Sequence, residues 1–178
     1  VGVLMGILLQ IVNAALIIGG QAVSASMGLS MANMVDPSMG NVPVIAQFFV
    51  ICSTLIFLGL GGHVLVISLL LESFELLPIN SALELQGLLK LTIEWSAMMF
   101  VGAILIGLPL MASLLFINIG LGVITRTAPA LNIFAVGFPA MILAGIVLLS
   151  LSMTSIGYRI QWLWQESFEI IGQALGIR

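Results

Sequence analysis

The chain has 178 residues, of which 61% are hydrophobic and 6% are charged, and its net charge is −3. Eleven acidic and basic side chains cannot cover the surface of a water-soluble domain of this length. Three further classes are excluded, because disordered chains have low hydrophobicity, nucleic-acid-binding domains carry a basic face, and disulfide scaffolds need more cysteine than Cys52. We therefore expect a protein whose surface meets lipid or other apolar helices.

Long stretches without acidic or basic side chains divide the sequence. Four of them, each 31 to 35 residues long, contain no Asp, Glu, Lys or Arg: 1–35, 37–71, 95–125 and 127–158. A helix needs only about 20 residues to cross the hydrocarbon core of a bilayer, so each stretch can hold one spanning helix and part of a connection. We predict an all-α fold of hydrophobic, membrane-type helical hairpins with broken helices and a re-entrant, plug-like loop. Val1 already lies inside an apolar stretch, so we expect residues 1–178 to be one helical domain that lacks an N-terminal portion.

The first predicted element is a helix over residues 1–20. It ends at Gly19 and Gly20, and a pair of glycines weakens a helix while it lets backbones approach closely. We expect a bend or a tight packing point there.

Residues 21–43 form the predicted plug-like loop, which is rich in small residues and methionine. Met27, Met31 and Met34 are four and three residues apart, so they share one face wherever this stretch is helical. Asp36-Pro37 must end such a helix, because the residue before a proline is displaced from the helical region. We therefore expect a short helix followed by a loop that returns at Pro43. Methionine side chains adapt their shape, so a cluster of them can close a gap and reopen. The composition fits equally well a buried loop that serves only for packing.

The next predicted helix covers residues 44–77. It begins directly after Pro43, a residue type that suits the first turn of a helix. Three glycines, at positions 59, 61 and 62, create a weak point near its middle.

A kinked helix is predicted over residues 82–124. Ser81 and Glu84 fit a capping box at its start. Pro109 is expected to kink or break it inside an apolar stretch, which requires that a neighbouring group or water satisfies the freed backbone groups.

The last two predicted elements are a helix over 130–158 and an amphipathic tail over 160–176. A tight link of five residues, 125–129, makes the helix the antiparallel partner of the one before it. Pro139 lies inside this helix, and we expect it to bend the helix so that it fits a neighbouring chain. Tyr158, Arg159 and Trp162 suit the interface between membrane and water.

The residue types needed for catalysis are scarce. One histidine and one cysteine cannot make a metal site or a nucleophilic triad, so we predict a protein that is not an enzyme and needs no cofactor and no metal. Nucleic acid is not an expected partner. All acids and bases are placed at segment ends or in connections, which argues against an ion-coupled carrier.

Three separated groups of residues together resemble one known family. They are Gly20-Gln21 with Met27-Gly28-Leu29 and Asp36-Pro37; Gly62-His63 with Leu76-Leu77-Pro78-Ile79; and Asn118-Ile119-Gly120-Leu121-Gly122 with Arg126-Thr127-Ala128-Pro129 and Gly137-Phe138-Pro139. In this order, and over nearly the whole chain, they are similar to the FliR/SctT family of type III secretion export-gate proteins, and above all to its flagellar branch.

The resemblance implies a non-enzymatic, protein-conducting subunit that forms and gates a channel for unfolded flagellar proteins. It implies a location in the flagellar basal body at the bacterial inner membrane, and a cone-like assembly with FliP and FliQ. FlhB, FlhA and membrane lipid are further implied partners. The family's channel plug corresponds to residues 21–43, which implies roles in plugging or gating for Gly19, Gly20, Gln21, Met27, Met31, Met34, Asp36 and Pro37.

Two other interpretations are compatible with the composition. A subunit of a small-solute membrane transporter would enclose a polar path within this chain and carry an apolar belt of bilayer width. A purely structural membrane anchor would explain the hydrophobicity but not the unusual composition of residues 21–43.

Overall fold

The structure of the chain, a computed structural model, describes residues 1–29, 43–76, 85–127 and 133–176. Six α-helices occupy these ranges, and no strand occurs within them. The helices are α1 (Gly2–Ser26), α2 (Val44–Gly59), α3 (Gly62–Leu76), α4 (Leu85–Ser96), α5 (Met98–Thr127) and α6 (Ile133–Ala174). The predicted all-α fold is confirmed.

Most of these helices belong to rods that are long and apolar enough to cross a membrane. Three rods pass this test on their own: α1, the α4–α5 rod over 86–127, and α6. A fourth candidate is the pair α2 and α3, which is bent by 64°. The rods follow the four charge-poor stretches of the sequence, because a helix that is apolar on all sides can be stable only in lipid or among other apolar surfaces.

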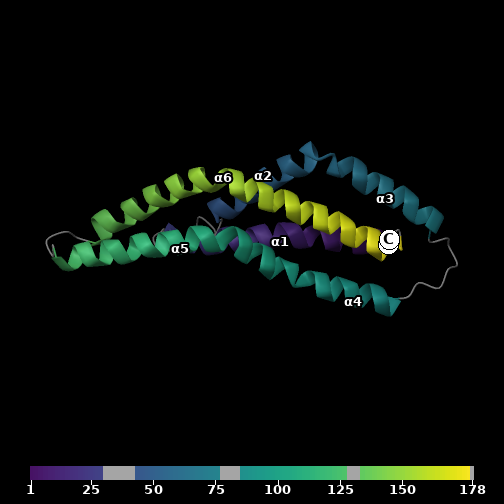
Figure 1. Ribbon diagram of the computed structural model, residues 1–178, viewed down its shortest axis with the longest axis horizontal. Helices are drawn as coiled ribbons and strands as arrows, with labels where there is room; N and C mark the ends of the chain where they lie inside the picture. Colours follow the sequence, from purple (N-terminus) through teal and green to yellow (C-terminus); the bar gives the residue numbers. More distant parts are fainter. Residues whose placement is uncertain (30–42, 77–84, 128–132, 177–178) are drawn as a thin grey trace, which may run out of the picture.

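Helix α1 is the centre of the packing and contacts α5, α2, α6 and α4. Its buried residues Leu8, Val12 and Leu16 are four residues apart and therefore lie on one face. Figure 1 shows α5 and α6 running antiparallel from a shared end of an elongated molecule. The indole Nε1 of Trp95 donates to the carbonyl oxygen of Leu8 at 3.1 Å, which attaches α4 to α1.

Helix α1 extends further than predicted. It continues through Gly19 and Gly20 to Ser26, so the first residues of the predicted loop 21–43 are helical. Both glycines are buried against neighbouring helices, and this packing outweighs the weak helical propensity of glycine. The structure therefore has a packing point here and no break in the helix.

The predicted helix over 44–77 consists of two helices, α2 and α3. The break falls at the expected glycine-rich weak point, where Gly61 adopts a φ of +72°. A left-handed φ is open to glycine at little cost but is strained for other residues, so position 61 can end one helix and start another.

The predicted helix over 82–124 is also divided, but at a different residue. The division between α4 and α5 lies at Ala97, whereas Pro109 lies inside the continuous helix α5. Proline removes only one intrahelical hydrogen bond, and the rest of the helix can persist on either side of it. The predicted capping box at Ser81 and Glu84 lies outside the described residues.

The predicted boundary between a helix over 130–158 and a tail over 160–176 does not exist, because α6 is one helix of 42 residues. The composition changes from apolar to amphipathic near Tyr158, but no proline or glycine pair interrupts the backbone there. Arg159, which the sequence placed at a segment end, therefore lies inside a helix.

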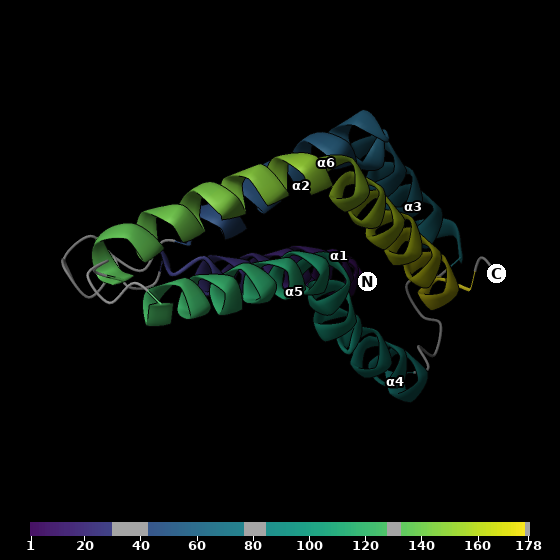
Figure 2. The same ribbon diagram turned by 60° about the vertical axis from the view of Figure 1, so that its left-hand side comes forward.

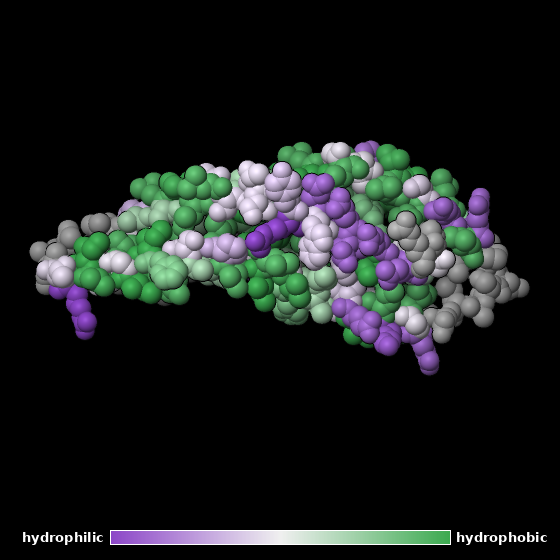
Figure 3. Space-filling model, in the orientation of Figure 1, coloured by the Kyte–Doolittle hydropathy of each residue, from purple (hydrophilic) through white to green (hydrophobic). Residues whose placement is uncertain are grey.

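The surface of the described residues is largely apolar. Apolar side chains with more than half of their area exposed occur on α1, α3, α5 and α6, among them Val3, Ile67, Phe74, Phe116, Leu143 and Leu151. Figure 3 shows hydrophobic residues along most of the visible face, with hydrophilic ones gathered toward the end that holds α3, α4 and the C-terminal part of α6. A surface of this kind must be covered by lipid or by other chains.

Candidate functional site at the end of helix α1

Four of the eight residues assigned to plugging or gating are described by the structure. Gly19, Gly20, Gln21 and Met27 lie in or directly after the last turns of α1. The other four, Met31, Met34, Asp36 and Pro37, lie outside the described residues. The candidate site is therefore the C-terminal end of α1, from Gly19 to Gly28.

Gly19 and Gly20 let α1 approach two helices at once. A Cβ atom on Gly20 would lie 2.4 Å from the Cα atom of Ala46 in α2, which is far inside contact distance. A Cβ atom on Gly19 would lie 3.1 Å from the carbonyl oxygen of Ala103 in α5. Close backbone contact of this kind needs small residues in both helices. The exposed Gln21 follows this packing point.

Met27 is buried and fills a recess on α6. It is 1% exposed, and a Cβ atom on Gly145 would lie 2.4 Å from its Cε atom and 2.8 Å from its Sδ atom. The absence of a side chain at position 145 thus makes the space that Met27 occupies. A flexible thioether suits such an irregular recess.

Gly28 turns the chain where α1 ends. Its φ is +79°, and its backbone N–H donates to the carbonyl oxygen of Ala25 at 3.0 Å, which closes the last turn. The ring of Phe138 in α6 lies beside this turn, 3.5 Å from the position of a Cβ atom on Gly28, which is an ordinary van der Waals distance. Met27 and Gly28 therefore anchor the end of α1 on α6, immediately before the residues that follow in the predicted plug-like loop.

Gly145 and Phe138, the α6 side of this anchor, were not predicted as site residues. The sequence gives no signal that pairs Met27 with a glycine more than a hundred positions away. Phe138 lies in one of the motifs that carry the family resemblance, but its partner could not be identified without the fold.

The recess on α6 leads to a prediction about compensating substitutions. Gly145→Leu should lower the free energy of unfolding by about 1–3 kcal/mol, because the new side chain competes with Met27 for the same space. Adding Met27→Ala should recover part of this loss, since the leucine can then fill the vacated volume. Thermal unfolding of the purified protein measures both effects.

Gly157→Leu is the matched control for Gly145→Leu. Gly157 lies in the same helix, and nothing lies within 4 Å of a Cβ atom placed on it. A loss at position 157 as large as that at 145, or no recovery with Met27→Ala, would contradict the packing of Met27 on Gly145.

The described residues hold no group of three or more His, Cys, Asp or Glu side chains that could bind a metal ion. His63 is exposed on α3, and Cys52 lies on α2. The end of α1 thus provides apolar packing contacts and a backbone turn.

The sequence was compared with those of known protein families. The sequence model of the family described as bacterial export proteins, family 1, matches residues 1–167. The chain belongs to this family. The resemblance to the FliR/SctT family is thereby confirmed.

Flagellar biosynthetic proteins from several bacteria are similar to the chain over most of its length. The flagellar biosynthetic protein FliR of Pectobacterium carotovorum subsp. carotovorum is 35% identical, over 98% of this chain and 67% of the relative. FliR of Escherichia coli (strain K12) is 34% identical with the same coverage of both chains. FliR of Bacillus subtilis (strain 168) is 32% identical over 88% of this chain and 62% of the relative. The family match includes the end of α1, Phe138 and Gly145.

Proposed function

We propose that the chain is a subunit of the bacterial flagellar protein-export gate, where it forms and closes the channel for unfolded flagellar proteins. The proposed location is the flagellar basal body at the inner membrane, and the proposed role is not enzymatic. Support comes from the family and from relatives that are named flagellar biosynthetic proteins. The long apolar helices support a membrane protein of the flagellar apparatus.

The observation that carries the gating role is the anchor at the end of α1. Gly20 fixes α1 against α2, and Met27 fixes its end on α6, directly before residues 30–42. A plug needs a rigid base on at least one side so that it returns to the same closed position. The anchored end of α1 supplies such a base for the segment that contains Met31 and Met34.

The proposed partners are FliP, FliQ, FlhB and FlhA-type proteins, with membrane lipid on the remaining surface. The exposed apolar side chains on α2, α3, α5 and α6 support extensive contact with other chains or lipid. A transporter for small solutes would need a polar path along the packed helices, but the buried side chains shared by α1, α5 and α6 are almost all apolar. The export gate is therefore the function that we favour.

The plugging role can be tested by replacing the segment after α1 while the anchored end of α1 is kept. Residues 30–41 are exchanged for a glycine-serine linker of equal length, which leaves Val23 and Met27 in the core. If this segment closes the channel, the assembled gate should leak ions, measured as membrane conductance in vesicles that contain the gate purified with its partners. A second variant, in which the linker retains Met31 and Met34, should leak less if the methionines form the seal.

Co-purification of the partner chains confirms that each variant still assembles. Unchanged conductance in a correctly assembled linker variant would refute the plugging role. Isolation of the chain as a lone monomer under mild detergent would refute the export-gate assignment and favour the transporter.

A further inference from the structure

We propose that Arg159 is a positioning residue that replaces the backbone hydrogen bond lost at Pro109 and thereby holds this turn of α5 against α6. The proposal concerns the chain itself and does not depend on what the assembled protein conducts. It rests on two observations: the proline inside α5 and the contact of Arg159 with the carbonyl of Leu105.

Pro109 leaves one carbonyl of α5 without its helical partner. In an α-helix the N–H of each residue donates to the carbonyl four positions earlier, and proline has no N–H. Position 109 therefore cannot serve the carbonyl of Leu105, although α5 continues as a helix from Met98 to Thr127. Within an apolar environment such a carbonyl needs another donor.

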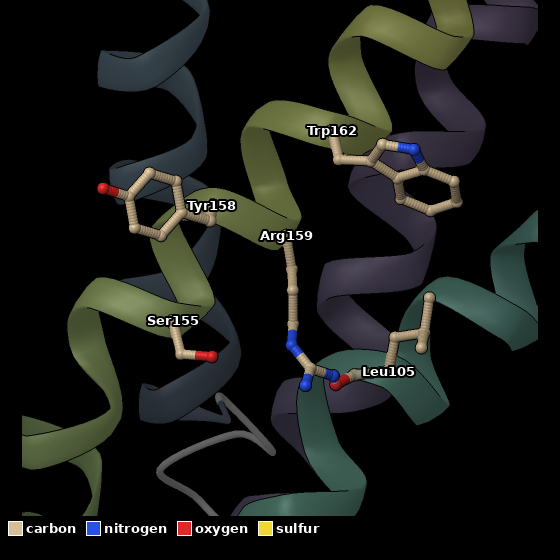
Figure 4. A pocket seen from close by; sticks show the side chains of 5 residues that line it. All are labelled: Leu105, Ser155, Tyr158, Arg159 and Trp162. Atoms are coloured by element: carbon tan, nitrogen blue, oxygen red, sulfur yellow. Dashed lines mark hydrogen bonds between the residues drawn. The ribbon is translucent and has the colours of Figure 1, made fainter.

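Arg159 provides that donor. Its Nη1 atom donates to the carbonyl oxygen of Leu105, across 54 positions of sequence. Figure 4 shows the side chain of Arg159 extending from α6 to the turn of α5 that carries Leu105. The acceptor is thus the same carbonyl that Pro109 leaves free.

No acidic side chain among the residues around Arg159 competes with this contact. It lies in an open depression of about 350 Å³ lined by Leu105, Ser155, Tyr158, Arg159 and Trp162. None of these neighbours is acidic, and the one salt bridge found among the described residues joins Lys90 to Glu94. A charged side chain inside a long apolar helix is costly and is usually retained for a purpose. Here its partner is a backbone carbonyl.

The α4–α5 rod and α6 change direction along the molecule, as Figure 2 shows. The bond from Arg159 joins α6 to the turn of α5 in which Pro109 supplies no N–H. The two helices therefore cannot separate at this turn without breaking it.

Arginine suits this role better than lysine. The guanidinium group has five N–H donors in a planar fork, so one can serve the carbonyl while others face water. The lysine ammonium is smaller and more strongly hydrated, so Arg159→Lys should retain only part of the effect.

The test is a double-mutant cycle in the full chain, purified with its partner chains or in mild detergent. Arg159→Met should lower Tm by roughly 5 °C, because it leaves the Leu105 carbonyl unpaired. In a Pro109→Ala background the same substitution should lower Tm by less than about 2 °C, since the alanine N–H can bond Leu105 within the helix. Arg126→Met, at the exposed end of α5, is the control and should have little effect.

Two outcomes would overturn the proposal. Equal losses from Arg159→Met in both backgrounds would show that Arg159 acts through a group other than the Leu105 carbonyl. Absence of any loss from Arg159→Met in the parent chain, which retains Pro109, would show that the contact has no positioning role. If Arg159→Met does not fold at all, the proposal requires that the double variant Pro109→Ala/Arg159→Met folds and that Arg159→Lys folds with a Tm below that of the parent. Failure of the double variant to fold would also refute the proposal.

Discussion

Replacing Gly20 by leucine is expected to prevent α1 from packing on α2 and to lower the free energy of unfolding by roughly 3 kcal/mol or more. Even a Cβ atom at this position would lie 2.4 Å from the Cα and 2.8 Å from the backbone nitrogen of Ala46. These are backbone atoms, which cannot move aside as a flexible side chain can. The two helices would have to separate along their contact, and apolar surface on both sides would be exposed.

Gly6→Leu is the control within the same helix. Gly6 is exposed, and nothing lies within 4 Å of a Cβ atom placed on it. Because leucine is a better helix former than glycine, this variant should be as stable as the parent or more stable by up to about 1 kcal/mol. Thermal unfolding in detergent compares the two. Equal stability of the Gly20 and Gly6 variants would show that α1 and α2 do not approach as closely as described.

Replacing Trp164 by alanine is expected to cost about 3–5 kcal/mol in the free energy of unfolding. Trp164 is 4% exposed and connects α6 to α2 by two kinds of contact. Its ring centroid lies 4.6 Å from that of Phe57, and its indole Nε1 donates to the hydroxyl oxygen of the buried Ser53 at 2.9 Å. Alanine would remove the aromatic contact, leave a cavity and deprive Ser53 of its donor.

Trp162 provides the comparison for Trp164. It lies two positions away on the same helix and is 38% exposed, so Trp162→Ala should cost less than half as much. Trp164→Phe should fall between them, because it keeps most of the apolar contact but loses the hydrogen bond. Unfolding monitored by circular dichroism ranks the three variants. A cost for Trp162→Ala that matches that of Trp164→Ala would contradict the assigned packing between α6 and α2.

The sequence predicts the helices well because hydrophobic stretches determine them. Long apolar segments without charge favour membrane-type helices, and the glycines at positions 59, 61 and 62 indicate the break between α2 and α3. Local signals fail where tertiary contacts decide. Gly19 and Gly20 were expected to end the first element, yet packing against Ala46 and Ala103 keeps α1 helical to Ser26.

Only the α1 residues of the candidate site could be predicted from the sequence. Met27 and the glycine pair stand out by composition, but their partners on other helices cannot be found from spacing. The same holds for Arg159: the sequence shows an arginine beside aromatic residues, which suggested a membrane interface. Only the fold reveals that the carbonyl left free by Pro109 lies within its reach.

The length of α6 has a consequence for how the chain sits in a membrane. At 1.5 Å per residue its 42 residues have a contour length of about 63 Å, whereas the hydrocarbon core of a bilayer is about 30 Å thick. About half of this helix must therefore extend beyond the hydrocarbon if it crosses perpendicular to the plane. Because the composition changes from apolar to amphipathic near Tyr158, the part of α6 that follows Tyr158 is then the part that extends beyond the hydrocarbon.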